Sequence, residues 1–333
     1  MNIRLKNIAV SVLLGAALVF PAGCSGAPEE QTSENSPQTD VTVSTPEIIS
    51  SAVLQTSALT RKTSGTSGEN TLTPPDTSVT TPDTSASRET QSTQDYPIPA
   101  SLSLSVAPPS TDTLNFTDAE LCAFFDDAVF VGDSISLGWR NYVMGKRQTD
   151  SNFLGNAQFL VSGSLGAESA LWDVTKESVH PMWQGEQMQL WNSVPLTGAK
   201  KVFIMFGLND IGRYSDLDYG IKMAVSNYRE LTGRIKANAP DVQFYVISAT
   251  YVVEGGEKGK VTSENMRKLN EALIDFCNES GYEFLNFADA LADSNGNLAL
   301  EYCSDGYVHQ TNAAYDVWTA LLKGYAAGAL NGN

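Results

Sequence analysis

The sequence predicts an α/β domain of three layers, in which helices cover both faces of a central parallel sheet. Two observations predict this fold. From about residue 116, short β-rich apolar runs alternate with longer stretches that have the apolar period of a helix. The short runs are apolar at nearly every position, as in strands that are buried on both faces. Strands that alternate with helices in this way form a parallel sheet between two helical layers.

The first 23 residues have the features of a signal peptide. Arg4 and Lys6 precede an apolar run of about 13 residues, which is shorter than the roughly 20 that a membrane span needs. Small residues then lead to Cys24. The Ala-Gly-Cys ending resembles the lipobox of bacterial lipoproteins, although Pro21 stands where an aliphatic residue is usual. We therefore expect an exported protein, anchored to the outer face of the bacterial cell membrane only through a lipid on Cys24.

Residues 24–112 are rich in Ser, Thr, Pro, Gln and acidic residues and have no sustained helical or strand period. Such a segment buries too little apolar surface to offset the entropy lost on ordering, so we expect a disordered stalk. Residues 113–333 then form the domain.

The net charge of −17 is spread along the chain without a run of Lys or Arg. This acidity disfavours nucleic acid as a partner. Three cysteines follow Cys24, namely Cys122, Cys277 and Cys303, with no C-x-x-C pair and no neighbouring pair of histidines. This spacing implies no metal site, and buried free thiols are the expected state.

The predicted strands and helices can be placed in chain order. The strands fall at 128–131, 201–206, 242–248 and 283–287. Helices are expected directly after Ser134, from about 219 to 237, after Thr262 and Ser263, either of which can be the N-cap, and from 312 to 327. Ligands bind outside the carboxyl ends of the strands in parallel sheets. Reactive residues are therefore expected at those ends.

The first strand ends in Gly132-Asp133-Ser134, and a helix follows. A serine at a strand-to-helix junction has its own N–H and the positive end of the helix beside any anion that forms there. Ser134 is therefore a candidate nucleophile. An ordinary helix N-cap is the alternative interpretation of the same tripeptide.

Two further segments offer donors to such an anion. The strand at 201–206 leads to Asn209, whose side-chain N–H groups can donate, and the glycine-rich loop at 162–167 can present a backbone N–H. An Asn turn and a flexible loop are the alternatives.

A serine needs a base to take its proton, and the chain has only two histidines. His309 lies just ahead of the last predicted helix, with Asp305 near enough in sequence to orient its ring. His180 has no adjacent carboxylate. His309 is therefore the expected base.

The combined residues resemble the SGNH/GDSL hydrolase family. Four blocks occur in the family's order: Gly132-Asp133-Ser134-Ile135, the loop from Gly163 to Gly166, Gly207-Leu208-Asn209-Asp210, and Asp305 with His309. The resemblance covers about residues 126–327. It departs from the family at three places: Ile135 replaces Leu, Asp305 precedes the histidine by four residues rather than three, and the second block lacks its usual polar neighbours.

The resemblance implies a flavodoxin-like α/β/α fold and ester hydrolysis through an acyl-enzyme, without metal or organic cofactor. Ser134, His309 and Asp305 would form the catalytic triad. The Ser134 and Gly166 amides and the Asn209 side chain would form the oxyanion hole, with Gly163 as the rival of Gly166.

A hydrolase on a long stalk suits a polymer that cannot be imported, so we expect a small ester or an O-acylated polysaccharide as substrate, most simply an acetylated carbohydrate. A lipase or lysophospholipase, an acyltransferase of the same fold, and a non-catalytic surface binding module are the alternatives. Trp139, Trp172, Trp183 and Trp191 include candidates for sugar stacking, although an aromatic residue is more often part of the core.

Overall fold

The computed structural model describes residues 97–332. The predicted signal peptide, Cys24 and most of the predicted stalk lie outside the described residues. A central sheet of five parallel strands has the order β2-β1-β5-β6-β7. The strands are β1 (Ala128–Gly132), β2 (Gln158–Val161), β5 (Lys201–Met205), β6 (Gln243–Ile247) and β7 (Glu283–Leu285).

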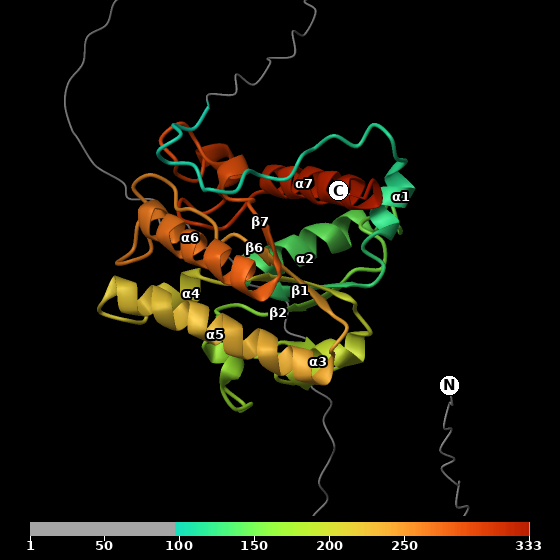
Figure 1. Ribbon diagram of the computed structural model, residues 1–333, viewed down its shortest axis with the longest axis horizontal. Coiled ribbons are helices and arrows are strands. Elements are labelled where there is room, and N and C mark those ends of the chain that lie inside the picture. Colours follow the sequence, from blue (N-terminus) through green and yellow to red (C-terminus); the bar gives the residue numbers. More distant parts are fainter. Residues whose placement is uncertain (1–96, 333) are drawn as a thin grey trace, which may run out of the picture. The chain divides into compact units, whose positions relative to one another are not determined.

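Helices cover both faces of this sheet (Figure 1), and the predicted three-layer α/β/α fold is thereby confirmed. One layer contains α1 (Asp118–Ala123), α2 (Ser134–Lys146) and α7 (Asn312–Leu330). The other contains α3 (Leu190–Thr197), α5 (Leu217–Asn238) and α6 (Ser263–Ser280). The shorter elements are α4 (Leu208–Ile211), the 3₁₀ turns η1 (Ser169–Leu171), η2 (Asp289–Leu291) and η3 (Leu300–Tyr302), and a hairpin of β3 (Met182–Trp183) and β4 (Glu186–Gln187).

Four aromatic rings stack across the sheet, one from each of four neighbouring strands. Phe130 on β1 stacks on Phe159 of β2 and on Phe203 of β5, with ring centres 5.5 and 4.7 Å apart. Phe203 in turn stacks on Tyr245 of β6 at 4.6 Å. These rings are register partners in the parallel ladders. Because the side-chain period of a strand is two, a slip of one residue would break the whole stack.

The register brings three strands to the same level at their carboxyl ends. Gly132 of β1 pairs with Val161 of β2 and with Met205 of β5. The segments that follow these strands contain Ser134, the glycine-rich loop and Asn209. All three predicted site segments therefore leave the sheet at one edge.

The strand β2 and the region from β3 to α3 were not among the elements predicted from sequence. In β2, only Leu160 is buried, and the other three residues are half-buried. An edge strand of this kind lacks the continuous apolar run that identified the other four strands.

Residues 97–112, which the sequence analysis assigned to the stalk, lie along the domain and lead to α1 (Figure 1). Leu104 is buried, and its N–H donates to Asp289 Oδ2 at 2.8 Å. The side chain of Asn286 donates to Val106 O at 2.6 Å. Further along, the Ser110 carbonyl lies where a Cβ on Gly324 of α7 would stand, so only glycine fits there.

Within residues 97–332, no helix is both long enough and apolar enough to span a bilayer. The three cysteines of this region are free thiols; Cys122 and Cys277 are buried, whereas Cys303 is half-buried rather than buried as expected.

Replacing Asp289 should loosen the N-terminal segment. The carboxylate of Asp289 accepts hydrogen bonds from Leu104 N–H, from Asn286 Nδ2 and from the Tyr251 hydroxyl. Asp289→Ala leaves these donors unpaired, and we expect a loss of about 1–3 kcal/mol in the free energy of unfolding. Denaturant titration would measure this loss. Asp275→Ala, which removes an exposed carboxylate from α6, is the control and should change stability little. Equal stability of the two variants would contradict the role of Asp289.

Candidate active site

The junction of β1 and α2 presents Ser134. Asp133 is the N-cap of α2, and its Oδ1 accepts the Ile135 N–H at 2.9 Å. This bond fixes the turn, so Ser134 becomes the first residue of a 13-residue helix. The positive end of the helix therefore faces any anion formed at the half-buried Ser134.

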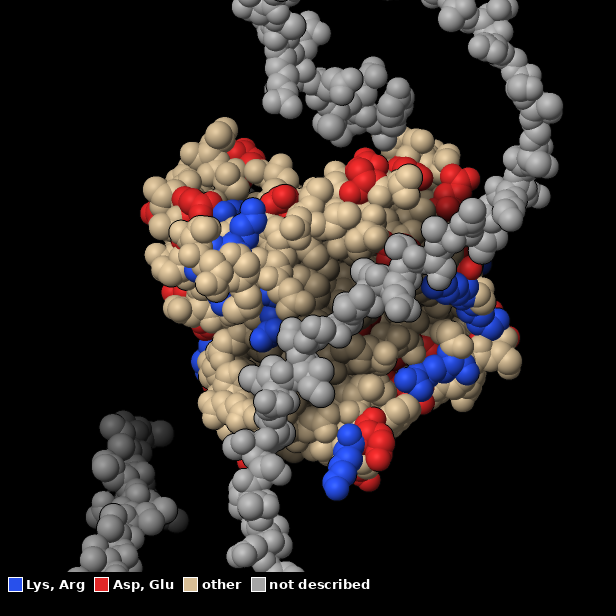
Figure 2. All heavy atoms as spheres, turned by 180° about the vertical axis from the view of Figure 1, so that it is seen from behind, with Lys and Arg blue, Asp and Glu red and all other residues tan. Residues whose placement is uncertain are grey.

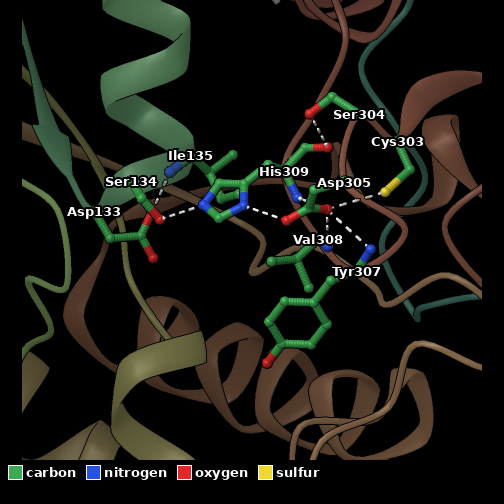
Figure 3. A network of polar contacts seen from close by, with 9 residues as sticks. All are labelled: Asp133, Ser134, Ile135, Cys303, Ser304, Asp305, Tyr307, Val308 and His309. Atoms are coloured by element: carbon green, nitrogen blue, oxygen red, sulfur yellow. Dashed lines mark hydrogen bonds and ion pairs between the residues drawn. The ribbon is translucent and has the colours of Figure 1, made fainter. Parts of the chain in front are cut away.

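The ring of His309 lies beside this serine (Figure 3). His309 Nε2 is 3.0 Å from Ser134 Oγ, although 175 residues separate the two in sequence. The loop before α7 holds the histidine, because both the N–H and the hydroxyl of Ser304 donate to His309 O. His180, the other histidine, is buried in the segment after η1, and neither of its ring nitrogens hydrogen-bonds to Ser134.

The carboxylate of Asp305 binds the other side of the ring. Asp305 Oδ2 lies 2.6 Å from His309 Nδ1. Asp305 Oδ1 accepts the backbone N–H groups of Tyr307, Val308 and His309 at 2.9, 3.1 and 3.2 Å. The spacing of four residues therefore still gives a bonded pair, because the chain curls around the carboxylate.

The hydrogen bonds to Asp305 keep it ionised. Burial by itself raises the pKa of Asp305, but the hydrogen bonds from the His309 ring and from the Tyr307 and His309 N–H groups outweigh burial and hold this pKa well below its usual range. An ionised carboxylate stabilises the imidazolium that forms when the ring takes a proton. The contacts from Ser134 through His309 to Asp305 thus have the geometry that the predicted triad requires.

Asp305→Asn should preserve the loop and impair turnover. Asparagine can still accept the three backbone N–H groups, but it does not hold the ring tautomer that accepts the serine proton. We expect kcat to fall by roughly 10³- to 10⁴-fold, as for other triads of this type. Steady-state kinetics measures the fall, and an unchanged melting temperature shows that the fold is intact. A variant with near wild-type kcat would exclude Asp305 from the triad.

A hydrogen bond between α4 and the glycine-rich loop holds Asn209 next to the segment that contains Gly166. Asn209 Nδ2 donates to Leu165 O at 3.0 Å. One of the two N–H groups of this amide is thereby used to position the side chain, and an anion can bind the other. The N–H of Gly166 donates to the Oγ of the fully buried Ser169 at 2.9 Å.

Gly163, the rival of Gly166, is half-buried and lies in open surroundings. Among residues 97–332, no hydrogen-bond acceptor engages its N–H. The assignment of either amide to the oxyanion hole stays a prediction. Ser169 is a residue that the sequence analysis missed, because a serine inside a 3₁₀ turn carries no motif.

Two buried carboxyl groups, those of Asp133 and Asp210, accept backbone N–H groups from the segments that carry these donors. No energetic role for either group was predicted from the sequence. Asp210 Oδ1 accepts the Glu168 N–H at 3.1 Å, and a Cβ on Gly166 would lie 2.9 Å from both Asp210 oxygens. The glycine-rich loop therefore packs directly on this carboxyl group, which only glycine permits. Burial raises the pKa of Asp210.

Asp133 is equally buried. Burial raises the pKa of Asp133 to about 7; the hydrogen bond from Ile135 opposes this rise, and the charge of Asp210 adds to it. The two carboxyl groups are thus electrostatically coupled, and holding both ionised costs stability.

Asp133→Asn should change how stability depends on pH. An unfolded aspartate titrates near pH 3.9, so the folded protein binds the extra proton between about pH 4 and 7. Stability then falls as pH rises through this window. The asparagine variant lacks this titration, so we expect it to gain stability relative to the wild type as pH rises from 5 to 8.

Thermal unfolding across this pH range tests the expectation, with the exposed Asp173→Asn as the matched control. If the melting temperatures of the wild type and Asp133→Asn change with pH in the same way, this expectation is contradicted.

A serine, a histidine and an aspartate joined at the carboxyl edge of a parallel sheet are typical of α/β serine hydrolases. The model of the GDSL-like lipase/acylhydrolase family matches residues 130–317, more than half of the chain. The protein belongs to this family, and the resemblance seen in the sequence is confirmed.

Several solved structures are similar to this chain at low sequence identity. An acylhydrolase from Bacteroides fragilis is 17% identical, with a TM-score of 0.47 over 62% of this chain and 88% of that one. A GDSL-like lipase from Bacteroides thetaiotaomicron is 18% identical, with a TM-score of 0.45 over 61% and 89%. A catalytic mutant of an acetylxylan esterase from Geobacillus stearothermophilus is 16% identical, with a TM-score of 0.41 over 58% and 90%. No curated protein matches the sequence.

Proposed function

We propose that this protein is a serine esterase that removes acetyl groups from an extracellular carbohydrate through an acyl-enzyme. The observation that carries the proposal is the bonded chain from Ser134 Oγ through His309 to Asp305, with contacts of 3.0 and 2.6 Å. These are the three groups that an ester hydrolysis of this kind requires, in hydrogen-bonding order.

The steps follow from the geometry. His309 Nε2 takes the proton of Ser134 Oγ as this oxygen attacks the ester carbonyl carbon, while the Nδ1–H remains bonded to Asp305. The Ser134 N–H at the start of α2 and the free N–H of the Asn209 amide stabilise the oxyanion. The third donor is the unengaged Gly163 N–H, or the Gly166 N–H if it leaves Ser169 Oγ. His309 then protonates the departing alcohol. Water attacks the acyl-enzyme with the same ring as base and releases the acid.

A bulky alcohol is favoured by the openness of the site. The side chains of His309 and Asp305 are 45% and 36% exposed, so the triad lies at the surface rather than at the bottom of a tunnel. A polymer can reach such a serine without entering the protein. Figure 2 shows Lys and Arg at the sides of one face and Asp and Glu along its upper rim. The net charge of −17 disfavours a polyanion as substrate.

Export and anchoring are part of the same proposal. The signal-like residues 1–23 and the lipobox-like ending at Cys24 support a lipid anchor on the outer face of the cell membrane. A hydrolase held there acts on polymers outside the cell.

Ester assays with the purified protein test the activity. We expect hydrolysis of p-nitrophenyl acetate in preference to p-nitrophenyl octanoate, and a loss of at least about 10⁴-fold in kcat for Ser134→Ala. Ser134→Ala removes a single half-buried oxygen, so its melting temperature should match that of the wild type. Preference for octanoate would indicate a lipase, and no hydrolysis of either ester would indicate a binding module. An active Ser134→Ala variant would refute the serine mechanism.

A further inference from the structure

Four side chains lie close together just after the two segments that carry the predicted oxyanion donors. Glu168 and Trp172 follow the glycine-rich loop, and Arg213 and Tyr214 follow α4. We name these four residues the rim cluster. The Arg213 guanidinium carbon lies 4.9 Å from the centre of the Trp172 ring. The Tyr214 hydroxyl donates to Glu168 Oε2 at 2.9 Å, and Arg213 Nε lies 4.0 Å from the same oxygen. The cluster therefore combines a flat aromatic ring with donors and acceptors of balanced charge.

The backbone ties this cluster to the predicted oxyanion hole. Arg213 Nε donates to Asn209 O at 2.9 Å. The N–H of Glu168 donates to Asp210, whose carboxyl group supports Gly166. The cluster is thus fixed at the carboxyl edge of the sheet, on the same two segments as the predicted oxyanion donors.

Trp172 differs from the other four tryptophans in its exposure. It is 44% exposed at the carboxyl edge, just after η1. Trp139 and Trp318 are buried in the core, and Trp183 is half-buried in the β3–β4 hairpin. Trp191 stacks on Arg234 near the end of α5 that leads to the amino edge of the sheet. Of the tryptophans, Trp172 alone offers a large apolar face to solvent near the predicted site.

The chemistry of the rim cluster fits a sugar ring better than an acyl chain. A pyranose has an apolar C–H face that can pack on the indole, and hydroxyl groups around its edge that can bind a carboxylate and a guanidinium. A long acyl chain would displace the water around Glu168 and Arg213 without replacing its hydrogen bonds, which costs free energy. Because the two charges balance, a neutral sugar is favoured over an acidic one.

We propose that the rim cluster is a carbohydrate subsite, in which Trp172 stacks on a neutral pyranose of the acetylated polymer while Ser134 attacks the acetyl group. This inference rests on the proposed esterase function and names the part of the substrate that the protein recognises. Trp172 is a specificity residue here and takes no part in bond breaking.

The test compares one variant on two kinds of substrate. Trp172→Ala is assayed with p-nitrophenyl acetate, which has no sugar, and with O-acetylated oligosaccharides built on xylose, mannose and N-acetylglucosamine. For the oligosaccharide that the wild type cleaves best, we expect kcat/KM to fall at least about tenfold more than for p-nitrophenyl acetate, mainly through KM. Trp172→Phe, which keeps an aromatic face, should recover part of the loss.

Trp191→Phe is the matched control, since Trp191 also stacks on an arginine, at 4.6 Å, but away from the predicted site. Trp191→Phe should leave unchanged the ratio of kcat/KM for the oligosaccharide to kcat/KM for p-nitrophenyl acetate. Equal losses on both substrates in Trp172→Ala, or no loss on the oligosaccharide, would overturn the subsite. Failure of the proposed function is distinguishable, because the wild type itself would then hydrolyse no acetyl ester.

Discussion

The register of the parallel strands is the constraint on which the rest of this structure depends. The stacked rings of Phe159, Phe130, Phe203 and Tyr245 join four strands across the sheet. Since each ring is the register partner of the next, the stack and the backbone ladders favour the same alignment. This alignment brings Gly132, Val161 and Met205 to one level. Ser134, the glycine-rich loop and Asn209 then emerge together at the carboxyl edge.

The triad adds a connection that the sheet alone does not make. Ser134 begins α2, whereas His309 lies in the loop before α7, and both helices belong to the same layer (Figure 1). The Tyr315 hydroxyl of α7 donates to Ile135 O at the start of α2, so a buried hydrogen bond between the helices accompanies the contact between Ser134 and His309. Geometry at the site is thus supported by packing beneath it.

The buried carboxyl groups near the site lower the stability of the fold when they are ionised. Asp133 and Asp210 are both buried, and burial raises the pKa of each. Each carboxyl group accepts backbone N–H bonds that shape a turn, one before α2 and one in the glycine-rich loop. The protein therefore retains two buried carboxyl groups at a cost in free energy, because the turns that hold the predicted donors need acceptors for their N–H groups.

The sequence by itself determined the fold class, four of the five strands of the central sheet, and the identities of Ser134, Asn209 and His309 as candidates. These inferences rest on local information: apolar runs, strand-end positions and the small number of histidines. Only the tertiary structure decided that Asp305 reaches the ring across a spacing of four, because a curled loop is not encoded in spacing. The same holds for the edge strand β2, whose half-buried residues give a weak pattern, and for residues 97–112, whose packing depends on partners such as Asp289 far along the chain. The partner of the Gly166 amide and the exposure of Trp172 also arise from contacts between distant segments, which no local pattern contains.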